Sequence, residues 1–171
     1  MMMHDANSLK ITTPSDREIA MVRVFNAPPR LVFDALTRPE LLKRWLGPRD
    51  WQLVVCEIEL QVGGTYRYVM RGPDGAEMGW GGVYREIVPC ERVVATETFD
   101  VSWYPGNALV TSVLTEQNGR TTLTSTVLYE TREARDAVLA SPMESGLAES
   151  YDRLDELLTT MSAVQGHRDG A

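Results

Sequence analysis

The longest regular hydrophobic pattern lies near the C-terminus, where apolar residues recur every three or four positions from Met143 to Met161. This spacing places them along one stripe of a helix. Ser141 and Pro142 precede the stripe, and both are typical of a helix start. The sequence therefore predicts a long helix from Pro142 to about Met161. The stripe must pack on a large apolar surface, and we expect part of it to cover a cavity. Gly146 lies inside the helix, where the missing side chain leaves room for a close approach or an open space.

The middle of the chain alternates between apolar and polar residues, which is typical of strands. Turn residues such as Gly63-Gly64 and Asn118-Gly119 separate the alternating segments. Strands joined by short turns are antiparallel. The predicted strands span about 17–25, 51–60, 65–71, 77–88, 92–99, 108–116 and 120–129. Glycines at 79, 81 and 82 indicate a bend in one of them.

Helical spacing also predicts two short helices after the first strand, beginning near Pro29 and Pro39, and a third at 132–139. Thr37 to Glu40 has the form of a capping box for the second helix. The predicted fold class is α+β: a curved antiparallel sheet of six to seven strands wrapped around the long C-terminal helix. We expect one domain at 17–162, with a flexible polar tail at 1–16 and another tail at 163–171.

Composition and charge exclude several classes of function. The net charge is −7, which argues against nucleic-acid binding and against a polybasic membrane-surface module. No apolar run is long enough for a membrane span, and no secretory signal pattern is present, so we predict a cytoplasmic protein. Cys56 and Cys90 lie far apart and are interpreted as free thiols.

Residues for catalysis or metal binding are scarce in the predicted domain. The two histidines, His4 and His167, lie in the predicted tails, so no Ser-His-Asp or Cys-His arrangement is expected on the core. Zinc-ligand spacing and phosphate-binding glycine loops are also absent, and we expect no metal and no cofactor. An acid–base carboxylate stays open, since four acidic residues lie in or beside strands: Glu77, Glu86, Glu97 and Asp100.

Aromatic and methionine side chains gather on the segments that would surround the long helix. Buried Tyr and Trp need hydrogen-bond partners, which are easier to supply around a pocket than in a packed core, and Met adapts to varied ligand shapes. A large aromatic core explains the same residues without a ligand. The candidate ligand-binding residues are Trp45, Tyr66, Tyr68, Met70, Met78, Trp80, Tyr84, Trp103, Met143, Leu147 and Tyr151.

Several segments of the chain together resemble a known family. They are residues 26–37, 39–48, 62–71, 73–75, 82–94 and 143–154. This set resembles the heat-shock-protein ATPase activator homologue branch of the START-related, Bet v-like (SRPBCC) superfamily, which includes the polyketide cyclase-like proteins. The resemblance covers about residues 17–158. It implies a helix-grip fold, in which an antiparallel sheet and the C-terminal helix enclose a deep apolar cavity.

Two positions depart from the family's usual pattern. Glu59 and Gln61 stand where the family often has Asp and Arg ahead of a Gly-Gly turn, and Cys90 replaces a proline. Neither change affects the expected fold, but the first argues against transferring function from that turn residue by residue.

Three functions are consistent with this fold. The first is non-catalytic binding of a small, largely apolar molecule, such as a lipid, a polyketide or an antibiotic, in the cavity. The second is a protein-interaction module resembling the co-chaperones, although the eukaryotic co-chaperone has a further N-terminal domain for which this chain leaves no room. The third is a polyketide cyclase or aromatase, which would need a carboxylate or Arg in the pocket, and Glu86 is the candidate. A homodimer and a chaperone partner both stay open.

Overall fold

The computed structural model describes residues 8–169, and their side chains as far as residue 163. Within these residues one sheet of eight strands and four helices form the fold. The strands are β1 (Lys10–Thr12), β2 (Glu18–Phe25), β3 (Gln52–Ile58), β4 (Thr65–Arg71), β5 (Glu77–Val88), β6 (Arg92–Phe99), β7 (Ala108–Gln117) and β8 (Arg120–Tyr129). The helices are α1 (Pro29–Thr37), α2 (Pro39–Trp45), α3 (Arg132–Leu139) and α4 (Met143–Asp169).

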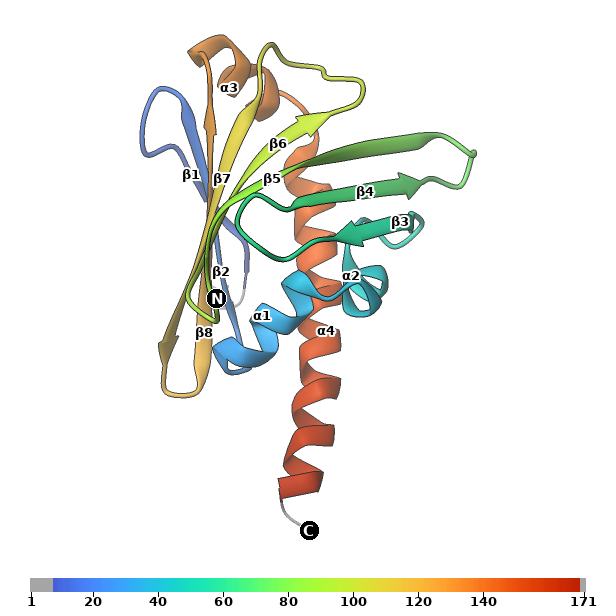
Figure 1. Cartoon of the computed structure of the whole chain (residues 1–171), viewed down its shortest axis with the longest axis vertical. Coiled ribbons are helices and arrows are strands. Elements are labelled where there is room, and N and C mark those ends of the chain that lie inside the picture. The colour runs from blue at the N-terminus through green and yellow to red at the C-terminus, as the bar shows by residue number, and fades with distance from the viewer. Residues whose placement is uncertain (1–7, 170–171) are drawn as a thin grey trace, which may run out of the picture.

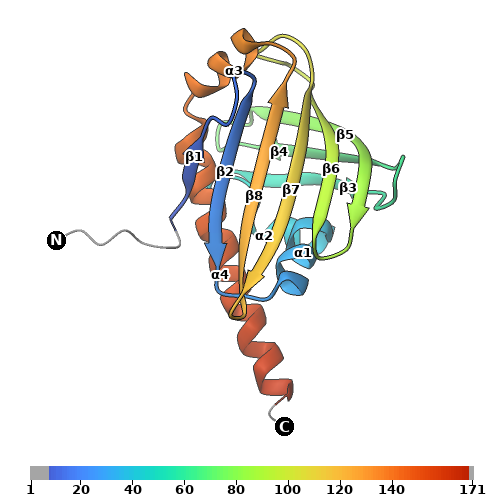
Figure 2. The same ribbon diagram turned by 90° about the vertical axis from the view of Figure 1, so that its left-hand side faces the viewer.

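The sheet is antiparallel throughout, in the order β1-β2-β8-β7-β6-β5-β4-β3. It curls strongly, so that β3 and β4 run crosswise to β2, β8 and β7 (Figures 1 and 2). Figure 1 shows α4 along the concave side, with α1 and α2 beside it. This arrangement is the predicted helix-grip fold, because the sheet wraps around the C-terminal helix.

The bend of the sheet is concentrated in β5, the strand whose glycines indicate it. A side chain at Gly82 would collide with the backbone carbonyl oxygen of Thr96 on β6, so only glycine allows the two backbones to approach this closely. The register of the β5–β6 pair then shifts between Tyr84 and Glu86. Such a bulge adds local twist and turns the side chains that follow to the other face.

The core lies where α4 meets the concave face of the sheet. Leu154 and Leu158 of α4 are fully buried against Phe25 and Leu123. The ring of Phe25 meets Tyr151 edge-on, with their centroids 5.8 Å apart. A second cluster contains Ile19 of β2 and residues of α3 and β8. The apolar stripe of the C-terminal helix is therefore core along its middle, as its spacing predicts.

The structure departs from the sequence prediction at three places. It has eight strands rather than six or seven, because β1 forms within the segment predicted to be a flexible tail and pairs with β2. Helix α4 continues past residue 162 to Asp169. The capping box predicted for α2 is wrong: Arg38 is the N-cap residue, and Thr37 donates its hydroxyl to the carbonyl oxygen of Phe33 at 2.7 Å. The tail predictions for residues 1–7 and 170–171 lie outside the described residues.

Helices in the described part of the chain are too short or too polar to cross a lipid bilayer.

Candidate functional site: a cavity between the sheet and helix α4

A cavity of about 710 Å³ lies between the concave face of the sheet and the N-terminal half of α4. Strands β4 to β8 supply the largest share of its lining residues, and α1, α2 and the loop at 100–107 close its sides. Its volume falls within the range of about 300–1,000 Å³ typical of small-molecule pockets. The helix-grip fold thus leaves a substantial hollow where a compact core would be expected.

All eleven candidate residues from the sequence line this one cavity, and whether they bind a ligand stays a prediction. They come from α2 (Trp45), β4 (Tyr66, Tyr68, Met70), β5 (Met78, Trp80, Tyr84), the loop after β6 (Trp103) and α4 (Met143, Leu147, Tyr151).

Aromatic rings form a continuous band along one wall. Tyr68 of β4 lies opposite Trp80 of β5 in the register, with ring centroids 5.4 Å apart. Trp80 stacks on Phe99 of β6 at 5.6 Å, and Phe99 meets Trp103 at 4.6 Å. Cross-strand pairing of inward-facing residues therefore turns three strands and a loop into one apolar aromatic surface.

Most polar groups of these aromatic residues are already paired within the protein. The Tyr66 hydroxyl donates to the carbonyl oxygen of Thr96 at 2.6 Å, and the Trp45 indole N–H donates to that of Ala35 at 2.9 Å. Tyr68 and Tyr84 are hydrogen-bonded to each other. These rings consequently present their apolar faces to the cavity.

Glu97 of β6 is the one charged residue among those that line the cavity. It pairs in the sheet with Ala108 of β7, which in turn pairs with Tyr129 of β8. Burial among these strands disfavours the carboxylate and raises the pKa of Glu97 from 4.5 to about 7. The cavity thus holds an acid that changes charge near neutral pH.

Tyr104 supplies a second polar group beside Glu97. Its side chain is 5% exposed, and its hydroxyl has no hydrogen-bond partner among the described residues. Its ring meets Tyr129 edge-on at 5.2 Å. Tyr104 packs in one cluster with Ala108, the register partner of Glu97, and both Tyr104 and Glu97 line the cavity. Burial, and then the charge of Glu97, raise the pKa of Tyr104. Glu97 and Tyr104 therefore form a polar spot in a largely apolar cavity.

The carboxylate suggested from the sequence, Glu86, is not in the cavity. Its side chain is about half exposed and forms an ion pair with Arg92 at 3.2 Å. The bulge after Tyr84 is the reason, since it moves Glu86 to the outer face of the sheet. Sequence alternation alone would have kept Tyr84 and Glu86 on the same face.

Glu77 and Asp100 are also ion-paired, with Arg71 at 2.7 Å and Arg67 at 2.6 Å. Sequence reasoning left Glu97 among the open carboxylates and did not nominate Tyr104. The available signal was that Glu97 is two residues from Phe99 and so shares its face. Because residues 93 and 94 are both apolar, the sequence does not show which face of β6 points into the cavity.

The cavity reaches the surface between the loop at 100–107 and the start of α4. Trp103 is 43% exposed and Met78 is 37% exposed, although both line the cavity, and Pro142 is exposed as well. Asn107, at the end of the loop, donates its backbone N–H to the carboxylate of Glu130. The mouth of the cavity is bordered by apolar side chains.

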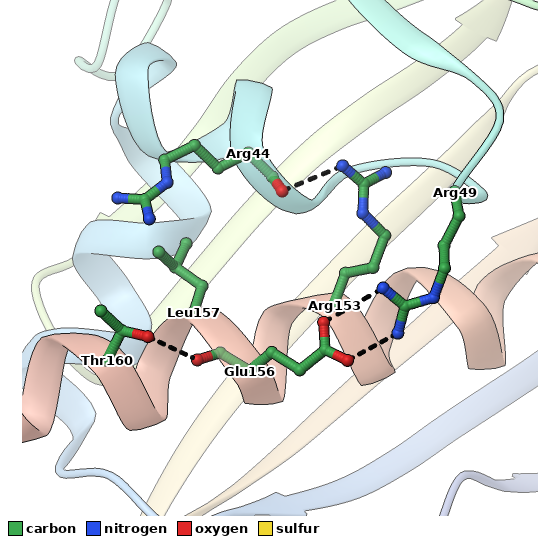
Figure 3. Close-up of a pocket in the computed structure, with 6 residues that line it drawn as sticks. All are labelled: Arg44, Arg49, Arg153, Glu156, Leu157 and Thr160. Atoms are coloured by element: carbon green, nitrogen blue, oxygen red, sulfur yellow. Dashed lines mark hydrogen bonds and ion pairs between the residues drawn. The ribbon is translucent and has the colours of Figure 1, made fainter.

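A second, polar pocket lies on the outside of α4, where the chain between α2 and β3 crosses the helix (Figure 3). Arg49 makes two hydrogen bonds to the carboxylate of Glu156, at 2.6 and 3.1 Å. Arg153 donates to the backbone carbonyl oxygens of Arg44, at 3.0 Å, and of Gly47, at 2.8 Å. These bonds hold the 44–49 segment on α4 and so position Gly47 in the cavity wall.

Among the residues that the structure describes, no group of three or more His, Cys, Asp or Glu side chains is placed to hold a metal ion.

A comparison with protein families matches residues 26–159 to the family described as "Activator of Hsp90 ATPase homolog 1-like protein". The chain belongs to this family. As the sequence resemblance implied, the activator-homologue domain extends from the end of β2 to the middle of α4 and includes the whole cavity wall except Met21 of β2. No curated protein matched the chain.

Solved structures agree with the family assignment. A protein from Rhodobacter sphaeroides is 37% identical, with a TM-score of 0.85, and the match covers 90% of this chain and 99% of that one. A protein from Nitrosomonas europaea is 25% identical, with a TM-score of 0.78, over 88% of this chain and 99% of that one. An activator-homologue-like protein from Aeromonas hydrophila, 19% identical with a TM-score of 0.65 over 82% and 93% of the chains, shares the fold. This fold supports a ligand-binding or activator-like module.

Proposed function

We propose that this activator-homologue chain binds one small, largely apolar molecule in the cavity and does not change it chemically. The observation that carries the proposal is the cavity itself, which is about 710 Å³ in volume, opens to the surface and is lined mainly by aromatic, aliphatic and methionine side chains. Transfer of an apolar ligand from water into such a site is favourable by about 25 cal/mol per Å² of apolar surface buried.

The rings of the cavity wall are held in position by the protein itself. Its rings are held by cross-strand pairs and by hydrogen bonds to the backbone, such as those of Tyr66 and Trp45. A preformed site loses little conformational freedom on binding, so more of the favourable burial contributes to affinity. The eleven candidate residues are the proposed contacts of the ligand.

An enzyme of the cyclase or aromatase kind is the second candidate. The observation that favours it is Glu97, an acid inside the cavity whose pKa of about 7 suits proton transfer at neutral pH. Chemical analysis of the ligand after incubation separates the two functions. A binder returns the compound unchanged, whereas an enzyme converts it.

A protein-interaction role has less support from the surface. Large apolar side chains that are exposed in the described residues lie in loops, at the cavity mouth or at the end of α3, and not on the outer face of the sheet. A chaperone partner, a homodimer and a cytoplasmic location stay predictions from the sequence and the resemblance.

The test of ligand binding is a thermal-shift screen with lipophilic and polyketide-like compounds, combined with native mass spectrometry of the purified protein. A ligand that binds the folded state raises its apparent stability by mass action, by about 2.7 kcal/mol at 100 times its Kd. We expect several compounds to raise the unfolding temperature and to appear as one-to-one complexes. A broad library without a single hit would contradict the proposal.

A variant that fills the cavity shows whether hits bind at the proposed site. Gly146 of α4 lines the cavity, and a side chain added there meets only Pro48, at an ordinary contact distance of 3.7 Å. Gly146→Phe should project a ring into the hollow, and Gly146→Ala is the matched control. Hits should lose at least tenfold in affinity with the Phe variant and keep their affinity with the Ala variant.

A further inference from the structure

The polar groups around the cavity are distributed unevenly. Its serine and threonine side chains have partners within the protein: Thr37 bonds to Phe33, Ser141 to Val138, Ser150 to Trp45 and Gly47, Ser112 to Ser125, and Ser125 also to Tyr151. The hydroxyl of Tyr104 is buried and has no hydrogen-bond partner among the described residues. Glu97 is partly buried, and the rise in its pKa comes from burial alone, with no contribution from a hydrogen bond or a charge of the protein. An unpaired buried polar group is costly, and native proteins seldom leave one without a reason.

The surroundings of Glu97 contain no positive charge that could serve as its partner. No Lys, Arg or His lines the cavity in the part of the chain that the structure describes. The short side chain of Ala108 separates Glu97 from Tyr129 in the sheet register. Residues two strands apart are about 10 Å from each other. Ala108 itself is 4% exposed and packs in one cluster with Tyr104 and Tyr129. The room for a partner from outside is therefore the cavity that Glu97, Tyr104 and Tyr129 line together.

Aromatic rings surround the same space. Phe99 lies two residues from Glu97 on the same face of β6, and Tyr104 lies against both Phe99, at 6.3 Å, and Tyr129, at 5.2 Å. The charge of Glu97 contributes to raising the pKa of Tyr66, Tyr104 and Tyr129, after burial. Aromatic faces attract cations through their quadrupoles, most strongly where water is excluded. A carboxylate among several rings is the arrangement that suits an organic ammonium group.

We propose that the molecule bound in this cavity is an amphiphilic amine. Its ammonium group pairs with Glu97 and makes cation–π contacts with the aromatic rings around it, while its apolar body fills the rest of the cavity. The inference rests on the proposed ligand-binding function and specifies the class of ligand. The Tyr104 hydroxyl completes the site as an acceptor for a second N–H of the ammonium group.

Two other ligand classes fit less well. A carboxylate or phosphate ligand would meet Glu97 without any cation to offset the repulsion. A neutral alcohol could bond to both Glu97 and Tyr104, but it would leave the ionised carboxylate without a countercharge.

Binding of an amine should depend on pH because Glu97 must be ionised. With a pKa of about 7, its ionised fraction falls from about 0.9 at pH 8 to about 0.03 at pH 5.5. The other titratable groups that face it are Tyr66, Tyr104 and Tyr129, and burial keeps all three neutral across this range. Alkylamines with pKa values near 10, like lysine, stay protonated. Amine affinity should therefore fall about 30-fold between pH 8 and pH 5.5.

The test uses three probes with the same apolar body, 4-phenylbutylamine, 4-phenylbutanol and 4-phenylbutanoate, titrated calorimetrically at pH 8 and pH 5.5. Wild type should bind the amine at least tenfold more tightly than the alcohol at pH 8, and the carboxylate most weakly. Glu97→Gln keeps the shape of the side chain but not its charge, so it should remove the preference for the amine and its pH dependence. Glu86→Gln, on the outer face of the sheet, is the control and should bind all three probes like wild type.

The outcomes separate this inference from the proposed function. Equal binding of amine and alcohol by wild type, or an amine affinity unchanged by Glu97→Gln, overturns the amine proposal and leaves apolar binding in place. If none of the three probes binds at either pH, and the broad screen also yields no hit, the ligand-binding function itself fails. Tyr104→Phe should weaken amine binding about threefold or more while leaving its pH dependence intact.

Discussion

Replacement of Glu97 by glutamine is the perturbation whose effect on stability follows most directly from the structure. The folded chain raises the pKa of this carboxyl from 4.5 to about 7 through burial. Between these two pH values the folded protein keeps a proton that the unfolded chain has lost. Stability therefore falls as the pH rises through this window, and the loss is complete somewhat above pH 7.

The size of the effect follows from the same two pKa values. At 1.36 kcal/mol per pKa unit, the raised pKa lowers the free energy of unfolding by about 3 kcal/mol at pH 8. At pH 5, where only the unfolded chain ionises, it lowers it by about 1 kcal/mol. Glutamine cannot ionise and does not carry this cost. We expect Glu97→Gln to be more stable than wild type at pH 8, with an advantage over wild type that shrinks by about 2 kcal/mol at pH 5.

The assay is urea denaturation of both proteins at pH 5 and pH 8 without ligand. Glu86→Gln is the control, since Glu86 lies on the outer face in an exposed ion pair with Arg92. Such pairs contribute about 0–1 kcal/mol, so this variant should change stability little at either pH. If Glu97→Gln were destabilised at pH 8, or if its effect were the same at both pH values, Glu97 would not be a buried, unpaired acid.

Further predictions concern single side chains of the cavity and core, measured by urea denaturation unless stated. Gly146→Ala should raise the free energy of unfolding by about 0.5–1 kcal/mol, because alanine favours the helix and the added methyl group meets only Pro48, at an ordinary contact distance of 3.7 Å; a loss would show that the methyl group collides with its surroundings. Tyr104→Phe should stabilise the ligand-free protein by about 1 kcal/mol, since it removes a buried hydroxyl without a partner, and a clear destabilisation would reveal a hidden partner. Asp152→Ala should cost about 2 kcal/mol, because Arg23, which is 5% exposed, loses the carboxylate that lies 2.7 Å away; a neutral result would mean that water replaces the carboxylate. Trp80→Ala should weaken ligand binding, measured by calorimetry, more than it lowers stability, and equal losses would make Trp80 an ordinary core residue.

The order of elements could be predicted because each one carries a local signal. Strand alternation, turn glycines and helical spacing predicted β4, β5, β6, β8 and α3 with the boundaries that the structure has. The stripe from Met143 to Met161 likewise marked the helix that the sheet surrounds. Strand β1 escaped prediction because three residues are too few to show a period, and its formation depends on pairing with β2.

Some residues of the candidate site could likewise be predicted from the local sequence, and others depend on contacts between distant segments. The aromatic candidates share faces within single strands, so sequence alternation was enough to group Tyr66 with Tyr68 and Met78 with Trp80. The choice between Glu86 and Glu97 depended on the bulge in β5, which arises from packing between neighbouring strands. Single-sequence patterns do not contain that information, and the inward-facing carboxylate could be identified only from the structure.

Titration calorimetry with the strongest compound from the screen, applied in parallel to wild type, Gly146→Ala and Gly146→Phe, tests the central claim most directly. One molecule should bind per chain, with a negative heat-capacity change that reports burial of apolar surface. Affinity should be kept in the alanine variant and lost in the phenylalanine variant. Equal affinity in all three proteins would place the ligand outside the cavity and contradict the account.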